Sequence, residues 1–136
     1  MKSTPHDIHN LMPNQVFVFG SNTAGIHGKG AARTAATLFG AQRGVAEGPT
    51  GQCYAIPTRI YIGRDDEHWK VRFEPVLLTD IARSVARFLV YADDHLEKEF
   101  LVTLIGCGYA GYKASDISPM FNSFCPLNVV LPIEFQ

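Results

Sequence analysis

The chain has 136 residues, of which 46% are hydrophobic and 18% charged, and this composition is typical of one globular domain with a buried core. The formal net charge is −1 and the 12 basic residues are scattered, which argues against a nucleic-acid-binding module. Three cysteines without a CxxC pair disfavour a disulfide scaffold and a structural zinc site. The lack of a long apolar run disfavours a signal peptide and a membrane span. We therefore expect a single cytoplasmic domain over residues 1–136, without metal or membrane.

Short apolar runs predict the strands of this domain. The run QVFVFG ends in glycine, QCYAIP is closed by proline, and FLVTLIG is almost continuously apolar, as expected of a central strand. The segment at 58–73 is charged and irregular, and fits either a hairpin or a loop, with RDDEH as a solvated tip that could border a pocket as a lid. The predicted strands are 15–20, 52–57, 100–106 and 128–132.

Helical spacing of apolar residues alternates with these strands. A helix is predicted at 30–40, a longer one at 74–92 with Pro75 in its first turn and Leu77 on its buried face, and a short one at 114–124 with Ser115 or Asp116 as its cap. Strands alternating with helices predict α/β layers around a largely parallel or mixed sheet. Ligands of such folds bind beyond the carboxyl ends of the strands.

The first glycine-rich loop, at 20–30, fails the known phosphate motifs. Gly25 and Gly30 have the Walker A spacing, but Ala31 and Ala32 stand where that motif requires Lys and Ser or Thr. The order of Gly25, Gly28 and Gly30 is also not GxGxxG. Glycines still let backbone amides approach an anion, and the helix that begins near Gly30 adds a positive dipole end.

The second glycine-rich loop, IGCGYAGY at 105–112, matches GxGxxG through Gly106, Gly108 and Gly111. Glu134 lies roughly where a ribose-binding acid would follow, so an NAD(P)-binding Rossmann-type protein is one interpretation. Because both loops directly follow a strand, we expect them at the same end of the sheet, facing each other.

The two loops together resemble a known family. GSNTAGIHGKGAA (20–32) resembles the first ligand loop of macro domains, TLIGCGYAGYKASDISPMF (103–121) resembles the second, and GQCYAIPT (51–58) occupies the place of the strand between them. The resemblance covers most of residues 14–132, and within the family it is closest to a small group of bacterial and phage macro-like proteins. It implies a three-layer α/β/α domain with a central mixed, largely parallel sheet that binds ADP-ribose or a related NAD-derived nucleotide.

The resemblance also implies roles for individual residues. Asn22 would contact the distal ribose, Tyr112 would stack near it, and Asp7 would read the adenine, although the glycine that usually precedes such an aspartate is His6 here. The two loops would enclose the diphosphate. The full predicted ligand-binding set is Asp7, Ser21, Asn22, Gly28, Lys29, Gly30, Ala31, Gly106, Gly108, Tyr109, Ala110, Gly111 and Tyr112.

The sequence leaves open whether the domain only binds the nucleotide or also hydrolyses ADP-ribosyl derivatives. The candidate catalytic side chains are Asn22, His27, Lys113 and Asp116, which would act on ADP-ribosylated proteins or nucleic acids, or on ADP-ribose phosphates. Each has a structural alternative: a turn-stabilising asparagine, an exposed loop histidine, a solvated lysine and a helix-capping aspartate.

Other reactive side chains are assigned structural roles. Cys107 fits a small buried thiol better than a nucleophile, because the elbow pattern GxCxG is absent. His6 and His9 have metal-binding spacing without a further ligand nearby, so we expect neither a metal nor any cofactor beyond the nucleotide itself.

Overall fold

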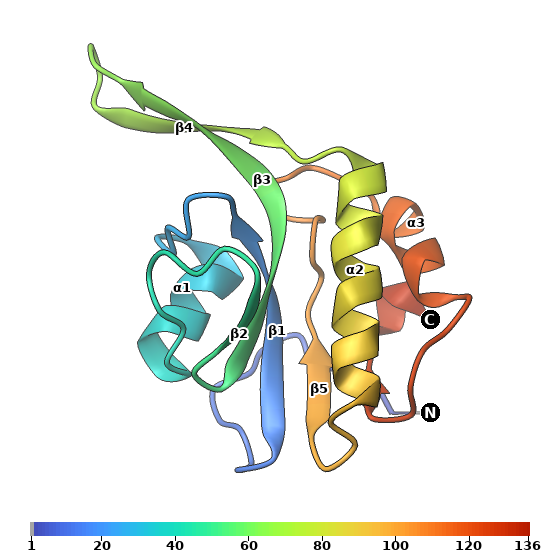
Figure 1. The fold of residues 1–136 in the computed structure, drawn as a ribbon. Helices are drawn as coiled ribbons and strands as arrows, with labels where there is room; N and C mark the ends of the chain where they lie inside the picture. The colour runs from blue at the N-terminus through green and yellow to red at the C-terminus, as the bar shows by residue number, and fades with distance from the viewer. Residues whose placement is uncertain (1) are drawn as a thin grey trace.

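The structure, a computed structural model, describes residues 2–136. Strands and helices alternate along most of the chain (Figure 1). The elements are β1 (Gln15–Asn22), α1 (Gly30–Leu38), β2 (Gly48–Thr50), β3 (Cys53–Asp65), β4 (Lys70–Pro75), α2 (Leu78–Asp93), β5 (Glu99–Val102), α3 (Ala114–Ile117), η1 (Ser118–Phe121), β6 (Val129–Val130) and η2 (Ile133–Phe135).

The six strands form one sheet of mixed direction. The order is β2-β3-β1-β5-β6, with β4 paired to β3 outside this path. β1 lies in the centre and is parallel to both β3 and β5, and β5 is parallel to β6, whereas β2 and β4 run antiparallel to β3. The expectation of an α/β fold with a mixed, largely parallel sheet is therefore confirmed.

Side-chain alternation along β1 divides the core into two layers. Val16 and Val18 face the side covered by α2, where Phe88 packs in the larger hydrophobic cluster. Phe17 and Phe19 face the other side and pack with buried alanines of α1. Because neighbouring residues of a strand point to opposite faces, this four-residue run anchors a helix on each side of the sheet (Figure 1). The result is a three-layer arrangement.

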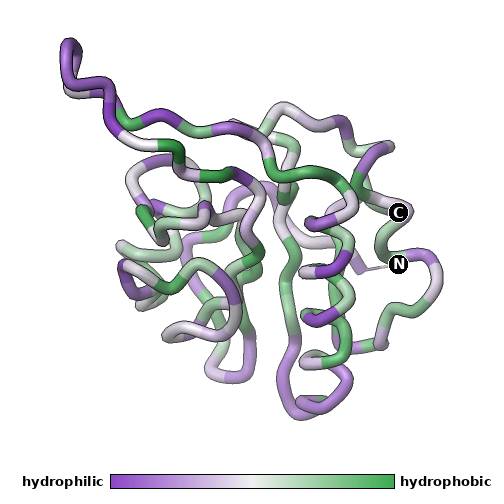
Figure 2. The backbone as a smooth tube through the Cα atoms, turned by 45° about the horizontal axis from the view of Figure 1, so that its top comes forward, coloured by the Kyte–Doolittle hydropathy of each residue, from purple (hydrophilic) through white to green (hydrophobic). Residues whose placement is uncertain are grey.

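β3 is longer than predicted, because it does not end at Pro57. Pro57 has no N–H, but it lies between the stretch of β3 that pairs with β2 and the stretch that pairs with β4, so it leaves no gap in those ladders. Beyond it, β3 and β4 form a hairpin, which we call the arm (residues 59–75). The arm projects from the body of the molecule (Figure 1) and has a hydrophilic tip (Figure 2). Of the two alternatives for 58–73, the hairpin is correct.

Several other predicted boundaries were wrong. Val76 N–H donates to Thr58 O at 2.9 Å, which extends the hairpin past Pro75. α2 therefore begins at Leu78, and Leu77 is 66% exposed instead of buried. The strand predicted at 100–106 ends at Val102 and continues as irregular loop. Within residues 2–136, no helix combines the length and the apolar character needed to cross a membrane.

Candidate functional site

A cavity of about 1010 Å³ opens at the carboxyl ends of the parallel strands. The two glycine-rich loops lie on opposite sides of it and come from β1 and β5, neighbours in the sheet. The expectation that both loops share one end of the sheet is thus confirmed. Of the predicted ligand-binding residues, the cavity is lined by Asp7, Ser21, Asn22, Gly28, Lys29, Gly30, Ala31, Gly106, Gly108, Tyr109 and Ala110.

The first loop is held in place from inside. The side-chain amide of Asn22 donates to Ile26 O at 2.7 Å, and its Oδ1 accepts from Ile26 N–H at 3.0 Å. Gly25 has φ +66 and lies so close to Gly44 that a Cβ at this position would be 2.5 Å from the Gly44 carbonyl carbon. Ser21 also donates its hydroxyl to Ala46 O. These contacts fix the loop without using the surface that faces the cavity.

The start of α1 offers backbone amides to the cavity. Lys29 is the N-cap residue and makes no side-chain cap hydrogen bond, and the helix begins at Gly30 with φ +59. Gly28 has nothing within 4 Å of where a Cβ would stand, so the space beside the loop is open. Free N–H groups at a helix start, together with the positive dipole end, favour an anion at this position.

The second loop is a tight turn closed by its own backbone. Tyr112 N–H donates to Gly106 O at 2.9 Å, and Gly111 N–H donates to Gly108 O at 3.0 Å. Gly106 and Gly111 have φ of +76 and +82, values that glycine adopts without strain. Gly108 has no atom within 4 Å of its notional Cβ, so this loop also borders open space.

Tyr112 and Gly111 were predicted to contact the ligand, but neither lines the cavity within the described residues. The Tyr112 ring packs against the α2 side of the core, and its hydroxyl donates to Val76 O at 2.5 Å. The side chain therefore fastens the second loop to the segment that precedes α2.

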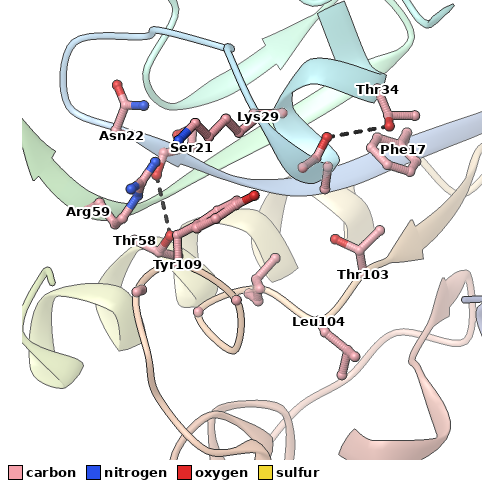
Figure 3. A pocket seen from close by; sticks show the side chains of 18 of the residues that line it. Phe17, Ser21, Asn22, Lys29, Thr34, Thr58, Arg59, Thr103, Leu104 and Tyr109 are labelled. Atoms are coloured by element: carbon pink, nitrogen blue, oxygen red, sulfur yellow. Dashed lines mark hydrogen bonds between the residues drawn. The ribbon is translucent and has the colours of Figure 1, made fainter. Parts of the chain in front are cut away.

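Arg59 is the main cavity residue that the sequence did not reveal. Its guanidinium carbon lies 4.1 Å from the centre of the Phe73 ring and 5.2 Å from that of Tyr109, within the range of cation–π attraction. Burial lowers the pKa of Arg59, and the nearby Tyr109 opposes that shift. Figure 3 shows Arg59 and Tyr109 together, with Lys29 above them and with Phe17, Thr34 and Thr103 toward the other end. This end of the cavity is cationic and aromatic.

The opposite end carries the N-terminal segment and η2. His6 Nε2 lies 2.8 Å from Glu134 Oε2, and this hydrogen bond lowers the pKa of Glu134. Asp7 pairs with His9 at 3.0 Å, and its side chain is 83% exposed. Each histidine thus has a carboxylate partner. Asp7 borders the cavity as predicted, but its carboxylate reaches toward solvent.

Three of the four candidate catalytic side chains lie outside the cavity. His27 Nε2 is 3.1 Å from Gln42 O and the ring packs edge-on against Phe19 at 5.4 Å, so His27 faces a smaller depression of about 290 Å³ behind the first loop. Asp116 accepts from Lys113 N–H at 3.0 Å at the start of α3, which is the capping role. Among the four, only Asn22 borders the main cavity within residues 2–136, and its amide is occupied by Ile26.

Cys107, predicted to be a small buried thiol, is partly buried in the structure. It packs against the hydrophobic cluster on the α2 side of the sheet, between two glycines that do line the cavity. Burial raises the pKa of its thiol, with Asp116 adding to the shift. A thiol whose pKa is raised in this way is a poor nucleophile at neutral pH.

Comparison with known proteins supports the fold but names no activity. No protein-family model matches the chain, and no curated protein matches it. A solved structure described as a protein of unknown function from Bacteroides thetaiotaomicron superposes with a TM-score of 0.55 at 15% identity. The alignment covers 89% of each chain. The likeness thus extends over nearly the whole domain and concerns its architecture.

Proposed function

We propose that the protein is a macro-like domain that binds ADP-ribose or a related NAD-derived nucleotide in the cavity between its two glycine-rich loops. The observation that carries the proposal is the pairing of the loops. Gly28 and Gly108 each border open space on the cavity side, from loops that follow adjacent parallel strands. A diphosphate placed between them would meet the free amides at the start of α1 on one side and the second loop on the other.

The size and polarity of the cavity suit such a ligand. A volume of about 1010 Å³ is at the upper end of the range for small-molecule sites. Lys29 and Arg59 supply positive charge at one end, although the chain as a whole has a net charge of −1. Tyr109 is 63% exposed and offers a flat apolar surface that a ribose or base would cover.

Binding is favoured over hydrolysis as the activity. The side chains of His27 and Asp116 have structural partners away from the cavity, Lys113 does not line the cavity, and both ends of the Asn22 amide are bonded to Ile26. A general base must reach the reacting group within hydrogen-bond distance. We therefore propose a module that senses or sequesters the nucleotide.

The Rossmann-type alternative is less well supported. The GxGxxG loop of that fold opens a long helix whose N-terminus holds the pyrophosphate. Here α3 has four residues and starts at Ala114, three positions after Gly111. Glu134, the expected ribose-binding acid, is paired with His6.

Thermal unfolding with ADP-ribose, NAD, ATP and AMP tests the proposal. At a concentration one hundred times its dissociation constant, a ligand that binds only the folded state adds about 2.7 kcal/mol to the free energy of unfolding. We expect ADP-ribose to raise the melting temperature more than AMP, since AMP lacks the second phosphate and the distal ribose. The absence of a shift with millimolar ADP-ribose would overturn the proposal, and equal shifts with NAD and ADP-ribose would favour the Rossmann-type alternative.

A further inference from the structure

The arm carries an ordered row of arginine and aromatic side chains on the face that continues the cavity wall. The register of β3 with β4 pairs Tyr61 with Phe73 and Arg64 with Val71, with a bulge between Tyr61 and Gly63. Since side chains alternate along a strand and paired residues share a face, these four residues point to the same side as Arg59. We call this surface the arginine–aromatic face: Arg59, Tyr61, Arg64, Val71 and Phe73.

Contacts between neighbours make this face continuous with the cavity. Arg59 stacks on Phe73 at 4.1 Å, and Phe73 meets Tyr61 edge-on at 5.9 Å between ring centres. At the far end, the Arg64 guanidinium lies 5.3 Å from the centre of the Trp69 ring. Arg59, Val71 and Phe73 also line the cavity, as does Lys70 at the edge of the arm. A ligand that leaves the cavity along the arm therefore meets cations and rings in turn.

The charge on this face has one sign. In the arm, which the structure describes throughout, Asp65 and Glu74 point to the opposite face, paired with Lys70 and Ile60. Asp66 and Glu67 belong to the turn at the tip. The arm is neutral in sum, but its arginine–aromatic face is purely cationic.

Trp69, at the tip of the arm, has two features that are typical of a binding surface. Within residues 2–136 it is the only non-glycine residue with positive φ, at 58°, and it is 73% exposed. Strained backbone and an exposed indole both cost free energy in the isolated protein, and both are typical of binding sites. Ile62, which is 44% exposed at the bulge, adds to the apolar surface.

We propose that the arm binds single-stranded nucleic acid along its arginine–aromatic face, leading the strand toward the nucleotide cavity. Rings stack on bases of any sequence, while arginines neutralise phosphates, and this combination is the usual means of holding single strands. The choice of nucleic acid over protein rests on charge and on continuity, because the face is cationic and begins at a cavity proposed to hold a nucleotide. The basic residues are scattered in the sequence, which argued against a nucleic-acid-binding module, but the hairpin brings Arg59 and Arg64 onto one face. The inference thus rests on the proposed function for its inner end.

Trp69 also provides the measurement, since it is the single tryptophan of the chain. We expect an oligodeoxythymidylate of about 12 nucleotides to quench its fluorescence by stacking. With Arg59 and Arg64 each meeting a phosphate, the logarithm of affinity should fall with the logarithm of salt concentration with a slope of about −1.4. ADP-ribose should leave the fluorescence unchanged, because Trp69 is not among the cavity-lining residues described.

Variants locate the binding on the arm. By fluorescence anisotropy of the labelled oligonucleotide, Trp69→Ala should weaken binding at least about fivefold without changing the salt slope. Arg64→Gln should weaken it and reduce the slope by about 0.7. The matched controls are Leu127→Ala, at an apolar residue that is 103% exposed, and Lys98→Gln, at the end of the sheet away from the cavity; both should bind as the unmodified protein does.

The outcomes separate the two proposals. No oligonucleotide binding at low salt, alongside an intact ADP-ribose shift, would overturn the arm proposal alone. Equal oligonucleotide binding by the arm variants and their controls would also overturn it. So would Trp69-dependent capture of a protein in the absence of any oligonucleotide binding. Arm-dependent oligonucleotide binding without an ADP-ribose shift would support the arm and overturn the function proposed for the cavity.

Discussion

Arg59 and Tyr109 join two parts of the chain that are remote in sequence, with the Arg59 guanidinium carbon 5.2 Å from the centre of the Tyr109 ring. Arg59 begins the arm and Tyr109 belongs to the second glycine-rich loop. Their contact closes the cationic end of the cavity and places a positive charge beside the proposed diphosphate.

Replacing Arg59 should weaken nucleotide binding more than it weakens the fold. Hydrogen bonds to a charged group contribute about 1.5–3 kcal/mol, so Arg59→Ala should lower ADP-ribose affinity at least tenfold in isothermal titration calorimetry. Arg83→Gln on α2, whose side chain is 71% exposed, serves as the charge-matched control. Unchanged affinity in Arg59→Ala would contradict this placement of the phosphates.

A side chain at Gly108 should block the ligand while leaving the protein folded. No atom lies within 4 Å of its notional Cβ, so Gly108→Val adds its bulk to the open space. We expect the free energy of unfolding to change by about 0.5 kcal/mol or less, as at other open surface positions. ADP-ribose binding should be lost, and full binding would show that the ligand does not pass between the loops.

A side chain at Gly25, in the first glycine-rich loop, should instead destabilise the fold. A Cβ there would be 2.5 Å from the Gly44 carbonyl carbon, at a φ of +66. Gly25→Ala should therefore destabilise the protein by more than about 3 kcal/mol in urea denaturation. A mild effect would mean that the backbone around Gly44 moves readily.

Asn22 should prove to be a structural residue of the first loop. Asn22→Ala removes both hydrogen bonds to Ile26, and leaving such groups unpaired costs about 1–3 kcal/mol each. We expect a lower melting temperature, and weaker ADP-ribose binding that follows from the loosened loop. Ala substitutions at Lys113 and Asp116, which lie outside the cavity, should leave the affinity unchanged. Release of free ADP-ribose from a modified substrate, abolished by Asp116→Ala, would instead establish a hydrolase.

Acid should weaken the fold through Glu47. Arg87 donates to both Glu47 oxygens, at 2.6 and 2.9 Å, and Ser84 donates to one at 3.0 Å. These hydrogen bonds from Arg87 lower the pKa of Glu47 below its ordinary 4.5. Because the folded-state pKa is the lower one, the stabilisation is present above pH 4.5 and is lost as the pH falls through the folded value. Glu47→Gln should show a smaller loss of unfolding free energy over that range, and an unchanged pH profile would contradict this assignment.

The layers of the fold and the two loops were predictable because they depend on local patterns. The alternation of Val and Phe at 16–19 and the glycines after β1 and β5 have direct conformational meaning. The longer β3 was not predictable, because Pro57 breaks a strand unless no strand on that side needs its missing N–H. Whether one does depends on where β2 begins, opposite Ala55, and where β4 ends, opposite Arg59.

The side chains that complete the cavity depend on contacts across the chain. Arg59 and Phe73 reach it only because the hairpin forms and lies next to the second loop. Tyr112 and Tyr109 are three residues apart in one glycine-rich loop, yet one ring is partly buried against the core and the other is 63% exposed. The turn geometry around Gly106 and Gly111 decides between them, and no local pattern gives that direction.

The continuity of β3 has a consequence for hydrogen exchange. The strand begins among fully buried residues at Cys53–Ile56 and ends in a hairpin exposed on both faces. Amides at the buried end should exchange only through global unfolding, whereas those beyond the bulge should exchange through local opening of the hairpin. One strand would thus report both events. If nucleic acid binds the arm, its protection factors should rise at the outer end of β3 while those of the buried end stay the same.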